Sequence, residues 1–372
     1  MPWEADVAAC RGRQGRLCEV MKAKGVDWTI VVRREHVQWL TGLYYPFTFE
    51  PVAALSAAGH CIAVIPGRKM PEVPSVDEHH GYEAQRHSTL RNDQRAASSA
   101  VLVDALKAHN VSGRLGVEFS MFPPHLSQAL KLDIFDIEPD LFRLRRRKDP
   151  DELAALRKAI AATEVMYARA REILRPGLSE LTMFNELQTA AVQSCGEMLT
   201  GTGNDYQCGA RGGPPRGGRV AADGELYILD LGPAYRGYFA DNCRAIAVNG
   251  KPTAMQQAAW QRIVEVLDMV KAEVKPGVSC RALFEKAQSM LDGAKPDATF
   301  DHHLGHGIGL FPHEAPHLNP NTNWDDVFEV GDVFTAEPGL YGPELKAGIR
   351  LEQDYLVTAT GVELLTGFSL AL

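Results

Sequence analysis

Four carboxylates occur in two similar segments of the chain and could together bind metal ions. The first segment carries Asp230 and Asp241, the second carries Glu337 and Glu352, and each segment consists of two β-like runs joined by a turn. Asp230 directly follows an apolar run, and burying a carboxylate there is unfavourable unless it is paired or bound to a cation. Hard divalent ions such as Mn²⁺, Mg²⁺ and Co²⁺ accept oxygen ligands. The pattern therefore predicts a carboxylate-rich metal site.

A dense group of histidines separates the two segments. None of the chain's 12 histidines lies between residues 126 and 301, whereas five lie within residues 302–317. These five are His302, His303, His306, His313 and His317. Glycines among them permit close approach of the backbone. A lone histidine is usually a structural residue, but this density favours a catalytic or metal-binding role.

An internal repeat indicates how these segments are positioned. RPGLSELTMF and KPGVSCRALF, at residues 175–184 and 275–284, match in register at Pro, Gly, Ser and Phe. Each copy follows a helical run, contains a serine that can cap the next helix, and precedes one of the carboxylate segments. The match predicts a domain of two related halves with a site between them. Alternatively, the match is a coincidence, because a Pro-Gly break followed by a capping serine commonly separates two helices.

The length of the chain predicts two domains, because 372 residues are about two and a half times the roughly 150 residues of a typical domain. Helices alternate with short strands in the N-terminal part, which predicts an α/β domain and shows no catalytic cluster. Asp149 and Pro150 then suit a helix start. We expect an N-terminal α/β domain at residues 1–147 and a catalytic domain at 148–372. The basic run at 145–148 reads most simply as a solvated linker.

Composition narrows the classes of partner. The formal charge of −8 has the wrong sign for binding nucleic acid over a broad surface. The seven cysteines form no CxxC pair and predict reduced thiols. No apolar run is long enough for a membrane span, and the first residues do not resemble a signal peptide. We expect a cytoplasmic protein that binds neither nucleic acid nor a membrane.

At this point the motifs resemble those of the pita-bread metallohydrolases, which include creatinase, prolidase, aminopeptidase P and methionine aminopeptidase. The resemblance rests on HxxxHGIGLxxHExP from His302, TAEPGLY from Thr335 and GIRLEQDYLVT from Gly348. RREHVQWLTGL, starting at Arg33, is similar to the N-terminal domain of creatinase-like and Xaa-Pro-cleaving members. The resemblance implies an α/β N-terminal creatinase-like domain, an α+β pita-bread catalytic domain with pseudo-twofold halves, and a homodimer.

The resemblance also implies a ligand set for two divalent metal ions. Asp230 would bind one ion, His306 and Glu337 the other, and Asp241 and Glu352 would bridge both. Mn²⁺ or Co²⁺ is favoured, with Zn²⁺ as a further candidate. Two such ions would hold a bridging hydroxide that attacks a carbonyl carbon.

Further roles follow from the same resemblance. Glu337 would relay a proton to the leaving nitrogen, His313 would stabilise the oxyanion, and His302 would line the substrate pocket. Arg350 would hydrogen-bond a bridging carboxylate without itself binding a metal ion. His303 and His317 read as loop or supporting residues.

One departure from the family pattern affects the substrate. Related peptidases usually carry another histidine about seventeen residues before the first metal-binding aspartate, and this chain has glycines there. Either Arg211, Arg216 or Arg219 contacts the substrate instead, for example at its carboxylate, or the glycine-rich loop is mobile and the substrate differs from Xaa-Pro. We expect a dinuclear hydrolase of an Xaa-Pro dipeptide or short peptide. The alternatives are a hydrolase of small non-peptide amides, as in creatinase or ectoine hydrolase, and a catalytically silent binding module.

Overall fold

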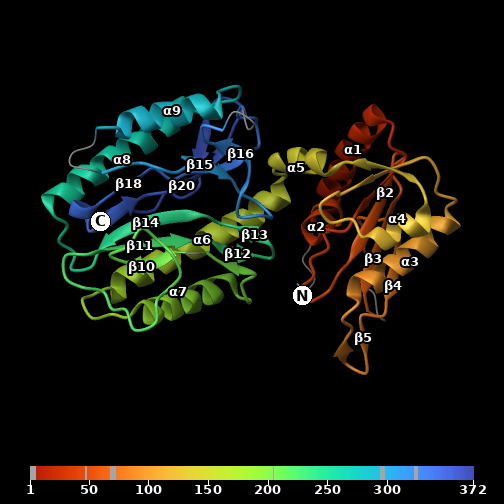
Figure 1. Cartoon of the computed structure of the whole chain (residues 1–372), viewed down its shortest axis with the longest axis horizontal. Helices are drawn as coiled ribbons and strands as arrows, with labels where there is room; N and C mark the ends of the chain where they lie inside the picture. Colours follow the sequence, from red (N-terminus) through yellow and green to blue (C-terminus); the bar gives the residue numbers. More distant parts are fainter. Residues whose placement is uncertain (1–5, 47, 68–72, 204, 294–297, 322–325) are drawn as a thin grey trace. The chain divides into compact units, whose positions relative to one another are not determined.

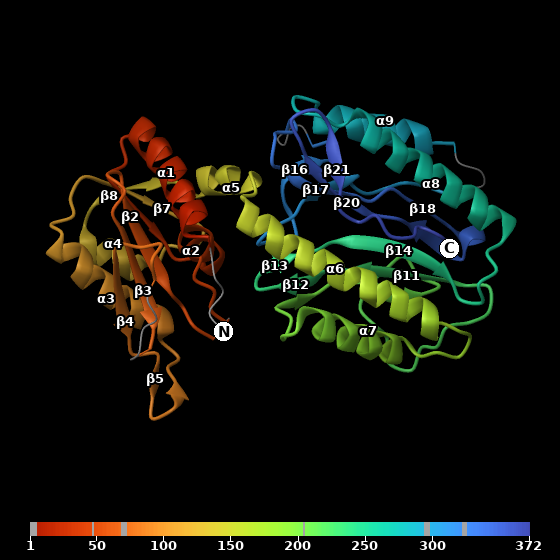
Figure 2. The ribbon, with the colours of Figure 1, turned by 180° about the vertical axis from the view of Figure 1, so that it is seen from behind.

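The computed structural model describes residues 6–46, 48–67, 73–203, 205–293, 298–321 and 326–372. It divides into two compact units, Met1–Arg145 and Arg146–Leu372, each considered separately below. Figures 1 and 2 show both units from opposite sides. No helix among the described residues is long and apolar enough to cross a membrane.

The N-terminal unit is built on a mixed six-stranded sheet with the order β4-β3-β2-β1-β7-β8. Its strands are β1 (Trp28–Val31), β2 (Val52–Ser56), β3 (Cys61–Pro66), β4 (Glu78–Tyr82), β7 (Arg114–Val117) and β8 (Asp133–Asp136), with a small hairpin of β5 (Gln85–Arg86) and β6 (Thr89–Leu90). Its helices are α1 (Val7–Lys24), α2 (Arg34–Thr41), α3 (Gln94–Ala108), α4 (Pro124–Leu130) and α5 (Glu138–Arg146), the last of which reaches the second unit. The alternation of helices and strands predicted this α/β arrangement.

Local sequence explains the ends of the first helix. The carboxylate of Asp6 accepts hydrogen bonds from the backbone N–H groups of Ala8 and Ala9, which would otherwise lack partners. Gly25 ends α1 with φ +63°, a conformation that glycine adopts without strain.

The second unit contains two helix pairs and the strands between them. Its helices are α6 (Pro150–Ile173), α7 (Glu180–Cys195), α8 (Ala254–Glu273) and α9 (Cys280–Leu291), with the short 3₁₀ helix η1 (Pro343–Leu345). Strands of the first half are β9 (Gly201–Thr202), β10 (Asp205–Cys208), β11 (Leu226–Leu231), β12 (Pro233–Tyr235), β13 (Tyr238–Phe239) and β14 (Asn242–Ala247). Strands of the second half are β15 (Gly305–Gly307), β16 (Glu314–Leu318), β17 (Val333–Ala336), β18 (Gly339–Gly342), β19 (Ala347–Arg350), β20 (Gln353–Val357) and β21 (Val362–Leu364).

The sequence repeat corresponds to a repeated turn between paired helices. Ser179 caps α7 and Ser279 caps α9 through the same side-chain bond to the third residue beyond. Gly177 and Gly277 adopt φ values of +87° and +88°, so both turns need glycine at the same step. The two copies therefore build equivalent helix–turn–helix units, as the sequence match predicted.

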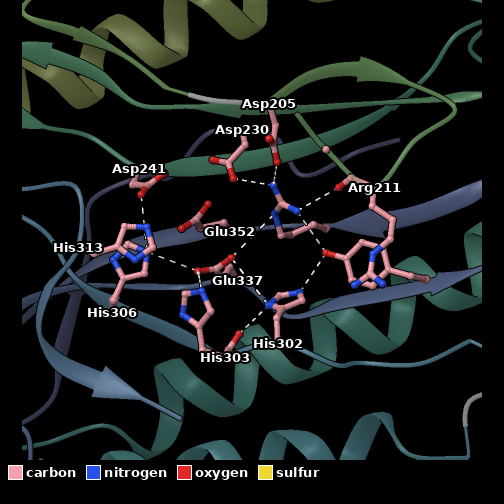
Figure 3. Close-up of a pocket in the computed structure, with 13 residues that line it drawn as sticks. Asp205, Arg211, Asp230, Asp241, His302, His303, His306, His313, Glu337 and Glu352 are labelled. Atoms are coloured by element: carbon pink, nitrogen blue, oxygen red, sulfur yellow. Dashed lines mark hydrogen bonds and ion pairs between the residues drawn. The ribbon is translucent and has the colours of Figure 1, made fainter. Parts of the chain in front are cut away.

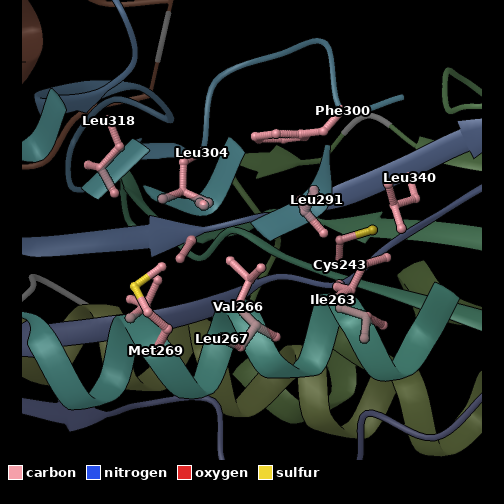
Figure 4. Close-up of a cluster of buried hydrophobic side chains, with 14 of the residues drawn as sticks. Cys243, Ile263, Val266, Leu267, Met269, Leu291, Phe300, Leu304, Leu318 and Leu340 are labelled. Carbon is pink, nitrogen blue, oxygen red and sulfur yellow. The ribbon is translucent and has the colours of Figure 1, made fainter. Parts of the chain in front are cut away.

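A hydrophobic core lies between α8, α9 and the strands that carry the predicted site residues. Ile263, Val266 and Val270 on α8 are fully buried and pack against strand residues such as Cys243 and Leu340 (Figure 4). A second cluster joins α6 and α7 to the opposite face of the β10-β11-β14 sheet. The strands that carry the carboxylates are thus covered by helices on both faces.

The basic run at residues 145–148 is not a solvated linker, and that prediction was wrong. The guanidinium of Arg146 lies 2.7 Å from Asp332, which is fully buried, and the ammonium of Lys148 lies 3.2 Å from the buried Glu314. Glu314 also accepts a hydrogen bond from the backbone N–H of Phe311. These cations therefore compensate buried carboxylates and fix the turn that precedes β16.

Candidate metal centre and active site

Strand alternation determines where Asp230 points. Tyr227 and Leu229 of β11 belong to the cluster with α6 and α7, whereas Leu226 and Ile228 face α8 and the second half. Because successive side chains of a strand point to opposite faces, Asp230 lies on the second of these faces.

Asp241 reaches the same face from the neighbouring strand. It directly precedes β14, whose residues Cys243 and Ala245 pack in the α8–α9 cluster, and Asp241 continues their two-residue period. Cys243 pairs with Asp230 across the two antiparallel strands. The first half thus directs two carboxylates toward the second half.

Glu337 and Glu352 come from strand ends of the second half. The backbone N–H of Glu337 donates to Leu304, and that of Glu352 donates to Cys243 of the first half at 2.9 Å. Both side chains are buried. The backbone bond to Cys243 therefore anchors one glutamate directly on the strand pair that carries the aspartates.

Two glycines allow His306 to approach these carboxylates. A Cβ atom on Gly305 would lie 2.0 Å from the carbonyl oxygen of Thr335, and one on Gly307 would lie 2.1 Å from that of Ala315. No side chain fits at such distances, so β15 can lie between β16 and β17 only because glycines flank His306.

The predicted residues surround one cavity of about 390 Å³, shown in Figure 3. Its lining comprises Asp205, Arg211, Gly212, Asp230, Asp241, His302, His303, His306, His313, Glu337, Tyr341, Arg350 and Glu352. The structure therefore brings all five predicted metal ligands together, with His302, His313, Arg211 and Arg350 around them. Arg216 and Arg219 do not line it.

Ligand atoms converge in two groups that share one glutamate. Asp230, Asp241 and Glu352 form one group, and His306, Glu337 and Glu352 form the other, with the ligand atoms of each group within 4.8 Å of one another. Nε2 of His306 lies 3.7 Å from Oδ2 of Asp241 and 3.5 Å from Oε1 of Glu337. Such spacings suit side chains that bind a common cation.

The buried oxygens fit this interpretation. Oδ1 of Asp230 and Oε2 of Glu352 are buried and lack a hydrogen-bond partner among the described residues. Burial and neighbouring carboxylates raise the pKa values of Asp241 and Glu352 well above their usual range. Carboxylates in such surroundings need either protons or cations, so the residues fit divalent metal ions.

The buried environment of the cavity favours the neutral forms of His302 and His306. Burial lowers the pKa of His306 well below its usual range and lowers that of His302 to about 4. The rings of His306 and His313 stack with centroids 3.6 Å apart. A neutral imidazole offers a lone pair to a metal or an N–H group to a substrate oxygen, so both uses are available here.

Arg350 lines the cavity and hydrogen-bonds to carboxylates there, but not to Asp241 or Glu352, which were assigned as bridging ligands. Its guanidinium donates to Oδ2 of Asp230 at 2.6 Å and also to Asp205, and it donates to the hydroxyl of Tyr341 at 3.3 Å. The expected bond to Asp241 or Glu352 is replaced by these contacts because the side chain extends toward β10 and β11. Arg350 therefore orients Asp230.

The three arginines named as substitutes for the absent histidine have different surroundings. Arg211 lies at the cavity with its guanidinium 4.0 Å from the ring centroid of Tyr341 and paired with Asp301. Arg216 bonds instead to the buried Glu180, and Arg219 bonds to Glu225. Those ion pairs hold Arg216 and Arg219 away from the cavity.

Four lining residues were not assigned to the site from the sequence, namely Gly212 and three residues with polar side chains, Asp205, His303 and Tyr341. Asp205 pairs directly with Asp230 across β10 and β11, a register that the sequence does not reveal. The hydroxyl of Tyr341 forms a hydrogen bond of 3.0 Å with Nε2 of His302. Its position in the TAEPGLY motif was the signal in the sequence that could have placed it in the site. His303 lies with Nε2 3.5 Å from Glu337, closer to the ligands than expected. His317 bonds to Asp326 and does not line the cavity.

Comparison with protein families gives the class of the protein. Residues 154–359 match metallopeptidase family M24, and residues 13–146 match the creatinase/prolidase N-terminal domain. The chain belongs to this metallopeptidase family and is a metallopeptidase-like hydrolase. The predicted family and the predicted combination of a creatinase-like domain with a pita-bread catalytic domain are confirmed.

Individual relatives agree with this assignment. An uncharacterized peptidase of Bacillus subtilis is 25% identical over 358 residues, covering 92% of this chain and 94% of its own. An uncharacterized peptidase of Staphylococcus epidermidis is 29% identical over 248 residues, covering 65% and 69%.

Solved structures show the same fold over nearly the whole chain. The X-Pro aminopeptidase of Thermotoga maritima has a TM-score of 0.79 at 20% identity, covering 96% of this chain and 98% of its own. The Xaa-Pro dipeptidase of Bacillus anthracis has a TM-score of 0.78 at 22% identity, covering 97% and 98%.

The pKa of Glu337 predicts how stability changes with pH when metal is removed. Burial raises this pKa from 4.5 to about 8. The folded chain therefore holds the proton more tightly than the unfolded chain, and the resulting stabilisation is complete below about pH 4.5 and is lost as pH rises through 8. With chelator present, we expect the urea midpoint to fall between pH 5.5 and pH 8, and to fall less in Glu337→Gln.

Glu344→Gln serves as the control, because Glu344 is exposed on η1. It should retain the full decrease seen in the wild type. A decrease of the same size in Glu337→Gln would show that this carboxyl does not couple protonation to folding.

Proposed function

We propose that this chain is a dinuclear metal-dependent peptidase that hydrolyses the amide bond of an Xaa-Pro dipeptide or short peptide. The observation that carries the proposal is the pair of three-ligand groups that share Glu352 inside one cavity. The solved structures of similar fold include enzymes described as X-Pro aminopeptidase and Xaa-Pro dipeptidase, which supports the substrate class.

The residues assigned to the two ions follow this grouping. Asp230 would hold one ion and His306 and Glu337 the other, while Asp241 and Glu352 would contribute to both. Mn²⁺ or Co²⁺ suits a set dominated by carboxylates, with Zn²⁺ as a further candidate. When bound, such ions lower the pKa of water and polarise a carbonyl oxygen.

The side chains around the ligands have distinct tasks. Oε2 of Glu337 accepts a proton from the attacking water and passes it to the leaving nitrogen. His313 donates a hydrogen bond to the substrate carbonyl oxygen, where negative charge develops during attack. His302, fixed by Tyr341, lines the pocket. Arg350 positions Asp230.

Arg211 is the group that we assign to the substrate carboxylate. Of the three arginines considered, it is the one at the cavity, and its side chain is 52% exposed, so a ligand can reach it. Its ring contact with Tyr341 orients the guanidinium. A carboxylate binds an arginine through two parallel hydrogen bonds.

A hydrolase of small non-peptide amides is the second candidate. The wall formed by Asp205, Arg211 and Gly212 occupies the region where related peptidases carry a histidine, and this difference favours another leaving group. A catalytically silent binding module is disfavoured because all five ligand positions retain ligating side chains.

Substrate turnover tests the proposal directly. The chain, loaded with Mn²⁺ or Co²⁺, is incubated with Ala-Pro, Leu-Pro, longer Xaa-Pro peptides and cyclic amidines, and released proline or amine is measured by chromatography. We expect cleavage of at least one Xaa-Pro substrate and none with chelator present. Turnover of the small amides alone would support the second candidate, and no turnover of any Xaa-Pro substrate would refute the proposal.

The role of Arg211 predicts a selective defect. Arg211→Ala should raise KM for Ala-Pro by about tenfold or more, because hydrogen bonds to charged groups contribute about 1.5–3 kcal/mol. The C-terminal amide of Ala-Pro lacks the carboxylate, so its KM should change little. Steady-state kinetics on both substrates measures the difference.

Arg157→Ala is the matched control, since Arg157 is an exposed arginine paired with Glu363. It should leave both KM values unchanged. Equal losses for the dipeptide and its amide in Arg211→Ala would contradict carboxylate binding by this residue.

A further inference from the structure

A separate group of metal-ligand side chains lies within the N-terminal unit. One ligand atom from each of His60, Glu78 and His109 lies within 4.8 Å of the others. We propose that these three side chains bind a divalent transition-metal ion such as Zn²⁺, and that His80 holds the carboxylate of Glu78 in position. This site is independent of the proposed peptidase centre.

Three different elements bring these side chains together. His60 ends the turn between β2 and β3, Glu78 begins β4, and His109 follows the last residue of α3. Glu78 pairs with Ile62 in the parallel β3–β4 ladder, so His60 and Glu78 lie at the same end of adjacent strands. Figure 2 shows α3, β3 and β4 alongside one another. The backbone of His60 is fixed by reciprocal bonds with Ser56.

The carboxylate of Glu78 is the centre of the group. Its Oε2 lies 2.7 Å from Nε2 of His109 and 3.5 Å from Nε2 of His60, and its Oε1 lies 2.5 Å from Nε2 of His80. Ligands about 2.0–2.1 Å from a tetrahedral Zn²⁺ lie about 3.3 Å from one another. The spacing of His60 and Glu78 already matches, and His109 needs only a small side-chain rotation.

One ring nitrogen is not explained by hydrogen bonding alone. Nε2 of His60 is buried and makes no well-aligned hydrogen bond within the described part of the chain. Nε2 of His60 lies 3.5 Å from Oε2 of Glu78 and the ring of His109 lies at a centroid distance of 4.9 Å, so a neutral His60 could bind a cation shared with both residues.

The donor set selects a class of ion. Two imidazoles and one carboxylate suit Zn²⁺, Co²⁺, Ni²⁺ or Cu²⁺, whereas Mg²⁺ and Ca²⁺ prefer oxygen ligands. The bond from His109 lowers the pKa of Glu78, which keeps the carboxylate ionised for binding. The side chains of Glu78, His80 and His109 are about one-third exposed, so an ion has access from solvent. A bound ion would join the end of α3 to the edge strand β4.

Zinc stoichiometry tests the site in the full chain. Protein stripped with chelator is dialysed against Zn²⁺, and zinc per chain is measured by mass spectrometry. We expect the wild type to bind one equivalent more than His60→Ala/His109→Ala. His125→Ala, which removes an exposed histidine of α4, should match the wild type. Equal zinc content in the wild type and the double variant would overturn the proposal.

A conservative variant covers the case in which the double variant fails to fold. Glu78→Gln retains the shape of the side chain and removes its charge, so zinc affinity at this site should fall at least tenfold. His80→Ala should weaken binding without abolishing it, because His80 orients the carboxylate. Circular dichroism verifies folding, and Mn²⁺-dependent turnover should stay unchanged in both variants. Unaltered zinc affinity in a folded Glu78→Gln variant would refute the site.

Discussion

The structure of the catalytic unit depends on carboxylates buried around one cavity with too little positive charge from the protein to balance them. Asp241, Glu337 and Glu352 all have raised pKa values because burial and neighbouring carboxylates disfavour their ionised forms. Among the described lining residues the cations are Arg350 and Arg211, and Arg211 is already paired with Asp301 outside the ligand group. Divalent ions, which the family implies, would supply the missing charge, and metal binding would then stabilise this region.

Both halves of the unit contribute carboxylates to the cavity. Each half repeats a helix, a glycine turn, a serine-capped helix and a pair of strands, and each contributes two carboxylates. The backbone bond from Glu352 to Cys243 and the bond from Arg350 to Asp230 connect the halves at the cavity. Glycines beside His306 let the strands approach closely enough for its ring to join them. The site therefore exists only where both halves meet.

Local signals in the sequence were sufficient for much of this arrangement. The caps at Ser179 and Ser279 follow from residue types within short segments, and the resemblance of short motifs to a known family implied the five residues that meet at the cavity. Partners distant in the chain were not accessible in this way. The pairing of Asp205 with Asp230 depends on strand register, and Arg216 is held by Glu180 from another element. The basic run at 145–148 was misread because its buried acidic partners lie far along the chain. For the same reason, the group of His60, Glu78 and His109 could not be found from the sequence, because its members come from three different elements.

The number of bound Mn²⁺ ions and their magnetic coupling test whether the cavity holds a dinuclear centre. Mn²⁺ suits the carboxylate centre and binds imidazole-rich sites weakly. Chelator-treated protein is reloaded, its manganese content is measured, and its electron paramagnetic resonance spectrum is recorded. We predict two ions per chain with a spin-coupled spectrum, and loss of the coupling in Asp241→Asn but not in Asp223→Asn, an exposed control. One uncoupled ion per chain, or coupling that survives in Asp241→Asn, would contradict a dinuclear centre bridged by Asp241.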